Sequence, residues 1–352
     1  MKKIFYLIGI STLLFLITSC NNEEVNQLEP KVKGYIPVLR GTFGTFTDNN
    51  PESGTRAGVI EDRDDFNSAQ GERFYWHNGD RVKVLFVDES GTETELIYQA
   101  VVPGEEKSNT CDFIVVDNGV TLEDGVYDVY GLYPADGWTK NATTGKWGVS
   151  FREIYDQLSQ RIHLLDGTSK HAGQYMFMKA DAGVTIGEGG SNRVDLSFKH
   201  LTSLIRVRVG KPDVPELAKL FRFSLGVKLD DVIPLPLGFE SFFVPLDGSL
   251  DNLDASSLAI RADNKQNAVG VQIPDDLLES LNGTDFDLFI PILPTGALQS
   301  KTLTFATKFY DEALSTQTFA KYIYRTIDRE QPIAFEQGKS YFFNIGTPEL
   351  NE

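Results

Sequence analysis

Hydrophobic and polar residues alternate with a period of two along most of this chain. In these runs every second residue is apolar, and the residues between are polar, charged or small. Arg206 and Arg208, for example, occupy the positions between apolar residues. A run of this kind predicts a β-strand that buries one face and exposes the other to solvent. The clearest runs are 205–209, 221–227, 286–290 and 303–309.

Turn-forming sequences separate these runs, and helical patterns are confined to two short pieces, 214–221 and 274–281. Many short strands with few helices predict an all-β sandwich architecture, and the lack of a fixed repeat argues against propellers and solenoids. A chain of this length normally divides into two domains. We place the boundary in the glycine-rich turn 183–192, which gives domains at 57–190 and 191–352.

The composition agrees with a folded but strongly acidic protein. Hydrophobic residues make up 41% of the chain, which is enough for a substantial core. The chain has 33 Lys and Arg residues and 50 Asp and Glu residues, so its formal net charge is -17. This acidity disfavours nucleic acid and anionic lipid as partners, because both are polyanions.

The first residues indicate export and lipid attachment. Lys2 and Lys3 precede an apolar stretch that is too short to span a bilayer, and small residues then precede Cys20. This pattern predicts a lipoprotein signal peptide at 1–19 and a lipid anchor on Cys20. The alternative is an ordinary secretory signal with an incidental cysteine.

No sequence motif supports an enzyme, a metal site or a bound cofactor. The chain lacks the spacings of common hydrolase, metalloprotease and nucleotide-binding motifs, and its four histidines are scattered. Once Cys20 carries lipid, Cys111 has no partner for an intramolecular disulfide. We therefore predict that Cys111 is a small residue packed at a strand edge, and that the protein is not an enzyme. A hydrolase with an unrecognised active site is a further alternative, but no sequence motif supports it.

Several short sequences, in their order behind the lipoprotein signal, carry a family resemblance. Considered one by one, their prominent residues predict structural roles: Trp76 and Tyr133 as core anchors, Gly79-Asp80 as a turn and His200 as a core-edge residue. Taken together, they resemble the fimbrillin family, which comprises Mfa-like proteins, type V pilins and their accessory subunits. The sequences are "FYWHNGDRVKVLF" (74–86), "VYDVYGLYPADG" (126–137), "QYMFMKADA" (174–182), "VDLSFKHLTSLIRVRV" (194–209) and "FEQGKSYFFNIG" (335–346).

The resemblance implies two tandem β-sandwich domains of the transthyretin-like, Greek-key type with a few short helices. It also implies a function for Arg56, which stands in the polar loop "PESGTRAGVIED" (51–62). Type V pilins are lipoproteins that an Arg-specific surface protease cuts in such a loop. The cut would fall between Arg56 and Ala57, and the segment 20–56 would leave with its strand, Val32 to Phe43. A strand from another fimbrial subunit would then pair with the vacated sheet.

Alternatives remain open at this point. The segment 20–56 could be a plain membrane-proximal linker, in which case the protein would keep its lipid. The protein could instead be a monomeric surface lipoprotein that binds glycans in nutrient capture, with Trp138 and Trp147 exposed and stacking on sugar rings. The other interpretation of these two residues is a long hairpin with packed tryptophans. The last strand, Tyr341 to Ile345, is either donated to a neighbouring subunit or kept in the chain's own sandwich. An adhesin would also have a ligand on a host or bacterial surface. We expect the protein itself at the outer membrane, exposed at the cell surface, and in the fimbria after processing.

Overall fold

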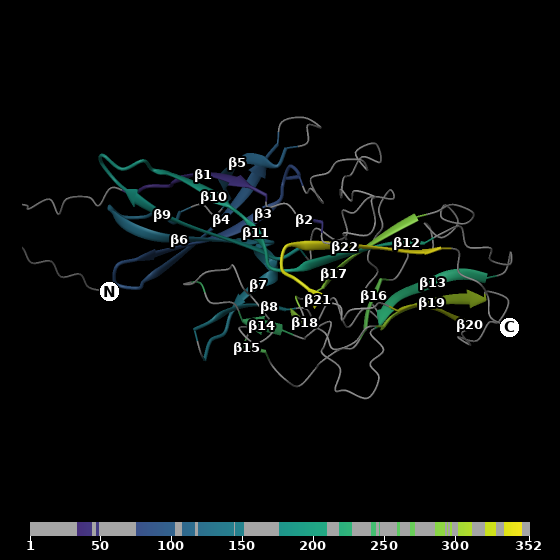
Figure 1. The fold of residues 1–352 in the computed structure, drawn as a ribbon. Helices are drawn as coiled ribbons and strands as arrows, with labels where there is room; N and C mark the ends of the chain where they lie inside the picture. Colours follow the sequence, from purple (N-terminus) through teal and green to yellow (C-terminus); the bar gives the residue numbers. More distant parts are fainter. Residues whose placement is uncertain are drawn as a thin grey trace, which may run out of the picture. The chain divides into compact units, whose positions relative to one another are not determined.

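In the computed structural model the described residues form mostly β-strands, as the alternation predicts (Figure 1). The one helical element among the described residues is a 3-10 turn, η2 (Ala135–Gly137). Within this part of the chain no helix is long and apolar enough to span a membrane. The structure describes residues 34–43, 47–48, 75–102, 108–116, 119–143, 145–150, 176–209, 218–226, 241–243, 246, 259–260, 268–271, 286–292, 294, 296–297, 302–311, 321–328 and 334–346.

The first sheet has eight strands in the order β10-β1-β5-β4-β3-β6-β9-β11. The last two strands in sequence, β10 and β11, follow each other directly along the chain but pair at opposite ends of this order. The stretch that contains them therefore joins the two ends of the sheet and gives β1 a neighbour on each side. The strands are β1 (Val38–Thr42), β3 (Arg81–Asp88), β4 (Glu93–Val101), β5 (Thr110–Val115), β6 (Gly125–Tyr133), β9 (Met178–Ile186), β10 (Arg193–Ser197) and β11 (Lys199–His200).

The inner face of this sheet encloses one continuous hydrophobic core. Leu96, Tyr98 and Ala100 alternate along β4 toward the core, and Val194, Leu196 and Phe198 do so along the β10 stretch. Because successive side chains of a strand point to opposite faces, alternation in the sequence becomes one buried face here. His200 is buried at the end of the same face, as predicted.

Two turns set the positions of strands around β1. Asp80 accepts a hydrogen bond from the backbone N–H of His77 at 2.8 Å, and Gly79 has a φ of 97° that favours glycine. These contacts confirm the predicted turn ahead of β3. In the turn between β9 and β10, the side chain of Asn192 accepts from Gly187 N–H at 3.0 Å, and its backbone carbonyl accepts from Val38 N–H at 2.9 Å. The second turn thus aligns β10 with the start of β1.

The remaining described strands form three four-stranded sheets and one two-stranded sheet, in the orders β17-β12-β22-β2, β16-β13-β19-β20, β15-β14-β8-β7 and β18-β21. In the first of these, β22 runs parallel to both β12 and β2, so it lies inside its sheet. The strands are β2 (Thr47–Asp48), β7 (Trp138–Lys140), β8 (Trp147–Ser150), β12 (Ser203–Val209), β13 (Ala218–Gly226), β14 (Ser241–Phe243), β15 (Ala259–Ile260), β16 (Ala268–Val271), β17 (Phe286–Ile292), β18 (Gly296–Ala297), β19 (Thr302–Asp311), β20 (Lys321–Asp328), β21 (Ala334–Phe335) and β22 (Lys339–Gly346).

The strands β10 and β11, which follow residue 190, pair with β1 and β9 of the first sheet, and the division into domains at 57–190 and 191–352 stays a prediction. Two other sequence-based expectations need correction. The helical pattern at 214–221 ends in a strand, since pairing with β19 and β16 holds Ala218–Gly226 extended. Arg206 is buried rather than solvent-facing: Asp287 accepts two hydrogen bonds from it, at 2.6 and 3.1 Å. The other helical pattern, 274–281, lies outside the described residues.

Candidate functional site

The feature that bears most directly on function is the segment 34–43, because it contains β1 and precedes Arg56 in the sequence. β1 pairs in parallel with β10 and antiparallel with β5, so both of its edges are occupied (Figure 1). Backbone hydrogen bonds extend the pairing at both ends. Tyr35 exchanges two bonds with Leu122 at 2.8 and 2.9 Å, and Phe43 N–H donates to Asn109 O at 2.7 Å. The N-terminal segment is thus an internal strand of the sheet.

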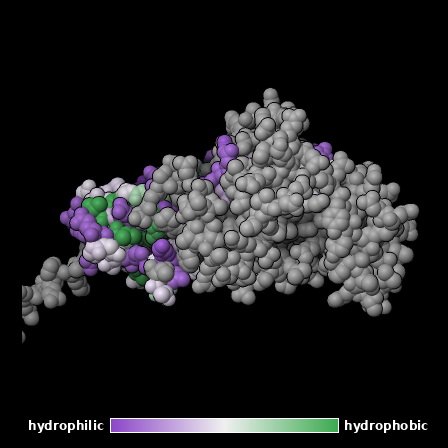
Figure 2. All heavy atoms as spheres, turned by 60° about the horizontal axis from the view of Figure 1, so that its bottom comes forward, coloured by the Kyte–Doolittle hydropathy of each residue, from purple (hydrophilic) through white to green (hydrophobic). Residues whose placement is uncertain are grey.

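The side chains of this segment alternate strictly between core and solvent. Pro37, Leu39 and Phe43 are buried, as is Gly41, and Tyr35 is half-buried. The residues between them face outward; 56% of Val38, for example, is exposed. Ile36 and Ile114 are exposed as well. Figure 2 shows the face of the molecule at the bottom of Figure 1, where hydrophobic residues lie among hydrophilic ones at the left-hand end. We call the space that the inward residues fill the β1 slot, bounded by β5, β10, Trp76 and Tyr98.

Two polar side chains of the slot hold the backbone of the segment. The indole N–H of Trp76 donates to Gly41 O at 3.2 Å, and the hydroxyl of Tyr98 donates to Pro37 O at 3.0 Å. Both bonds are buried, so losing either would leave a polar group without water or protein to pair with. Burial raises the pKa of Tyr98 well above that of a free tyrosine, and its hydroxyl therefore stays a donor.

Aromatic rings fill the end of the slot. Trp76 is in contact with Phe43, with ring centroids 3.8 Å apart, and meets Phe113, Tyr133 and Phe198 edge to face at 4.9, 5.4 and 5.5 Å. Edge-to-face pairs stabilise by about 0.5–1.5 kcal/mol beyond the area they bury. Trp76 and Tyr133 are core residues as predicted, and Trp76 is the centre of the cluster that receives Phe43.

Gly41 lies where the slot has no space for a side chain. A Cβ at this position would lie 2.7 Å from Phe113 Cε2 and 3.2 Å from Phe198 Cε2. On the neighbouring strand, Gly41 is directly opposite Cys111. The Cys111 thiol is buried, and this burial, reinforced by the carboxylate of Asp80, raises its pKa to about 12. Cys111 therefore packs in the core, on the strand β5 that lies between β1 and β4. β5 would be an edge strand only if β1 were absent.

The predicted processing and lipidation residues lie outside the described residues. These are the signal peptide 1–19, Cys20, Arg56 and Ala57, and most of the segment 20–56 with them. What the structure does describe of that segment is β1, which matches the predicted strand Val32 to Phe43, and the short β2. These two strands belong to different sheets. The lipid anchor and the cleavage site remain predictions.

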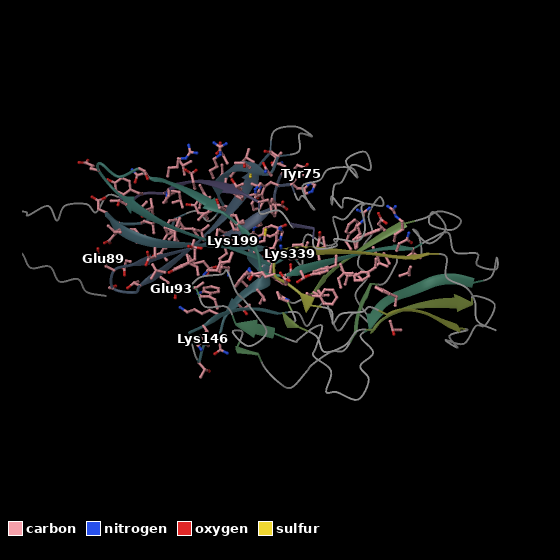
Figure 3. All side chains as sticks on the ribbon, in the orientation of Figure 1. Tyr75, Glu89, Glu93, Lys146, Lys199 and Lys339 are labelled. Atoms are coloured by element: carbon pink, nitrogen blue, oxygen red, sulfur yellow. The ribbon has the colours of Figure 1, made fainter. Side chains whose placement is uncertain are left out.

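The two tryptophans of the glycan hypothesis do not occupy an exposed position. Trp138 and Trp147 are only 1% and 4% exposed, which confirms the packed hairpin and contradicts exposed rings that stack on sugars. Trp138 donates to Tyr133 O at 3.0 Å, and Trp147 donates to the carboxylate of Glu93 at 3.2 Å. Figure 3 labels Glu93, on the strand β4 that supplies this acceptor. Lys83 of β3 also holds the hairpin: its ammonium lies 4.9 Å from the centroid of the Trp147 ring and donates to the backbone carbonyl of Trp138 at 3.3 Å.

The described residues contain no group of His, Cys, Asp and Glu side chains that could hold a metal ion. Among the described residues, the one carboxylate whose pKa is clearly lowered is that of Asp88, and hydrogen bonds from Ser90 and Thr92 within its own turn are the cause. Arg206 and Arg208 share the carboxylate of Asp287 between β12 and β17, which is a structural ion cluster. The hydrogen bonds of Asp88 stabilise a turn, and the ion pairs of Asp287 hold two strands together.

Sequence reasoning missed most of the slot. Tyr98, Phe113 and Gly41 were not singled out, although the alternation of Tyr35, Pro37, Leu39, Gly41 and Phe43 is visible in the sequence. That pattern could have identified the inward face of the strand. The partners across the slot come from residues far along the chain, and no local signal marks them.

Comparisons with known proteins give structural similarities alone. No protein-family model matches the chain, and no curated protein matches it. A candidate cell adhesion protein from Bacteroides ovatus is 13% identical with a TM-score of 0.46, and the match covers 91% of this chain and 96% of that one. A second, from Bacteroides fragilis, is 12% identical with a TM-score of 0.46 over 89% and 92%. The fimbrial anchor protein Mfa2 from Porphyromonas gingivalis is 11% identical with a TM-score of 0.31 over 81% and 80%.

The identities and TM-scores of these three structures are too low to assign this chain a family or a function. The contacts of β1 in its slot are therefore the basis on which a function can be proposed.

Proposed function

We propose that this chain is a structural subunit or accessory adhesin of a cell-surface fimbria, and that β1 is the strand it gives up on assembly. The observation that carries the proposal is the position of β1. It belongs to the segment ahead of Arg56, yet it is paired on both edges inside the first sheet. A plain membrane-proximal linker has no need of such a position.

Loss of β1 would create a binding site for another strand. The backbone groups of β5 and β10 that now pair with β1 would lose their partners, and the rings around Phe43 would lose a neighbour. Buried polar groups and apolar surface of this kind are unfavourable when left open. A strand from a second subunit restores both the hydrogen bonds and the packing, which is the physical basis of β-augmentation.

The same contacts predict that cleavage alone does not release β1. After a cut between Arg56 and Ala57, the segment would stay in place through its pairing, Leu39 and the Phe43–Trp76 contact. It would leave as an incoming strand takes over its hydrogen bonds. In this scheme lipidated Cys20 holds the uncleaved chain in the outer membrane, and exchange transfers the chain into the polymer.

The test is N-terminal sequencing of protein from cells that express an Arg-specific surface protease, with gels run without boiling. We expect the chain to begin at Ala57 and to form high-mass ladders. Arg56→Ala should keep the longer lipoprotein and abolish the ladders. Arg63→Ala is the matched control, because Asp62, Asp64 and Asp65 surround that arginine with negative charge.

A chain that still begins at lipidated Cys20 in the presence of the protease would contradict the proposal and leave a permanently anchored protein. The anchor itself has a separate test. Cys20→Ser should move the protein from the outer-membrane fraction to the soluble one, whatever happens at Arg56.

A further inference from the structure

We infer that the β1 slot accepts only strands with glycine at the position of Gly41, and that this chain's own C-terminal strand does not fit the slot, so that the donor is a different chain. The inference rests on the proposed function, because it specifies the partner of the same site. It concerns which strand can enter, whereas the proposed function concerns whether any strand does.

The slot has no room for a side chain at Gly41. A Cβ there would lie 2.7 Å from Phe113 Cε2, a distance that real Cβ contacts essentially never show, so a ring would have to move. The Phe113 ring abuts Trp76 edge to face at 4.9 Å. The Phe198 ring lies against Gly131 of β6, where an added Cβ would be 2.9 Å from Phe198 Cζ. Both rings are therefore enclosed, and overpacking of such a core is destabilising.

A shift of these rings would also disturb the hydrogen bond that holds the strand. Trp76 touches both Phe113 and Phe198, and its indole N–H donates to the carbonyl of Gly41 itself. A side chain at position 41 would push on the rings that position this donor. Steric cost and loss of the hydrogen bond would then occur together.

The other inward positions define the rest of the required pattern. Leu39 is completely buried and Phe43 packs on Trp76, so an incoming strand needs apolar side chains two residues before and two residues after its glycine. At the outward position 40, the register places the strand between Asp112 of β5 and Asp195 of β10. A basic residue directly before the glycine therefore suits the slot, as Arg40 does.

The C-terminal strand β22 fails this pattern in either register. If its apolar face of Tyr341, Phe343 and Ile345 points inward, no glycine falls on that face, and a large side chain meets Phe113. If the opposite face points inward, Gly346 can take the place of Gly41, but Asn344 then enters the fully buried position of Leu39. An amide without a partner in such a site is costly.

The experiment uses the full chain from Asn21, cleaved after Arg56 so that both pieces remain, and fluorescent synthetic peptides. The peptides have the sequences of Val32 to Phe43, of the same segment with Gly41→Ala, and of Lys339 to Gly346. We expect the first peptide to replace the native segment. The other two should enter at least tenfold more slowly, or not at all.

A matched pair of variants in the uncleaved chain checks the steric argument independently. Gly183 lies in β9 with no atom within 4 Å of an added Cβ, so Gly183→Ala should leave the midpoint of urea unfolding nearly unchanged. Gly41→Ala should lower that midpoint clearly. Equal midpoints for the two variants would overturn the inference.

The peptide outcomes separate the inference from the proposed function. If all three peptides enter at similar rates, strand exchange stands and the requirement for glycine is wrong. If the β22 peptide alone matches the native one, the chain can donate to its own kind, and the exclusion is wrong. If no peptide enters, the proposed function is lost, and the inference about its donor with it.

Discussion

The indole N–H of Trp76 donates a hydrogen bond to the backbone carbonyl of Gly41, at 3.2 Å, inside the core of the first sheet. Trp76 follows the loop that contains Arg56 in the sequence, and Gly41 precedes it. The bond therefore joins the two sides of the predicted cleavage site. After a cut at Arg56, this contact and those around it would be all that holds β1 to the sheet.

The inward residues of β1 should dominate its attachment. Leu39→Ala deletes most of a fully buried side chain, and we expect it to lower the free energy of unfolding by roughly 2–5 kcal/mol. Val38→Ala, on the exposed face of the same strand, should cost less than about 1 kcal/mol. Urea denaturation of both variants measures the difference. Similar losses would mean that the alternation of the segment does not determine its binding.

The buried hydroxyl of Tyr98 should slow the departure of β1. Tyr98→Phe removes its bond to Pro37 O and should cost about 1–3 kcal/mol, because a buried carbonyl is left without a donor. In the chain cleaved after Arg56, the rate of peptide exchange should rise. Tyr127→Phe is the matched control, since it removes a tyrosine bond to Glu123 O, away from β1. Equal exchange rates for the two variants would show that Tyr98 does not hold the strand.

Cys111 should make stability fall in alkaline solution. Its pKa is raised by burial to about 12 in the folded chain, from 9.0, so between these values the unfolded chain loses the proton and the folded chain keeps it. Unfolding is then favoured as the pH rises through this window, and the contribution of the thiol is fully present below it. We expect Cys111→Ala to flatten the fall in unfolding free energy between pH 8 and 11. An unchanged slope would mean that the thiol is not protected by β1.

The last strand should be necessary for the fold. β22 lies between β12 and β2, and Tyr341, Phe343 and Ile345 are buried. Deleting Ser340 to Glu352 removes these side chains and leaves β12 without one partner, so we expect a chain that lacks cooperative unfolding in circular dichroism. A folded, monomeric truncation would instead indicate that β22 is free to be donated, which would also weaken the argument for a separate donor.

Local patterns in the sequence were sufficient for the strands and for much of the core. Alternation predicted β12, β13, β17 and β19, the Val32 to Phe43 strand was found from its composition, and Trp76 and Tyr133 were recognised as core residues. These predictions succeed because the period of two is a property of a single extended strand and needs no knowledge of its partners.

Only the tertiary structure decided which strands pair and what the loop tryptophans do. The sequence left Trp138 and Trp147 between exposed rings and a packed hairpin, and the acceptors Tyr133 O and Glu93 hold their indoles inside the fold. Arg206 was expected in solvent, but Asp287 lies beside it on β17. The slot around Gly41 likewise combines Phe113 and Phe198, which are distant along the chain. The hydrogen-bond and ion-pair partners of a buried polar side chain come from other strands. Whether such a residue is buried therefore depends on strand pairing, which its neighbours in the sequence do not determine.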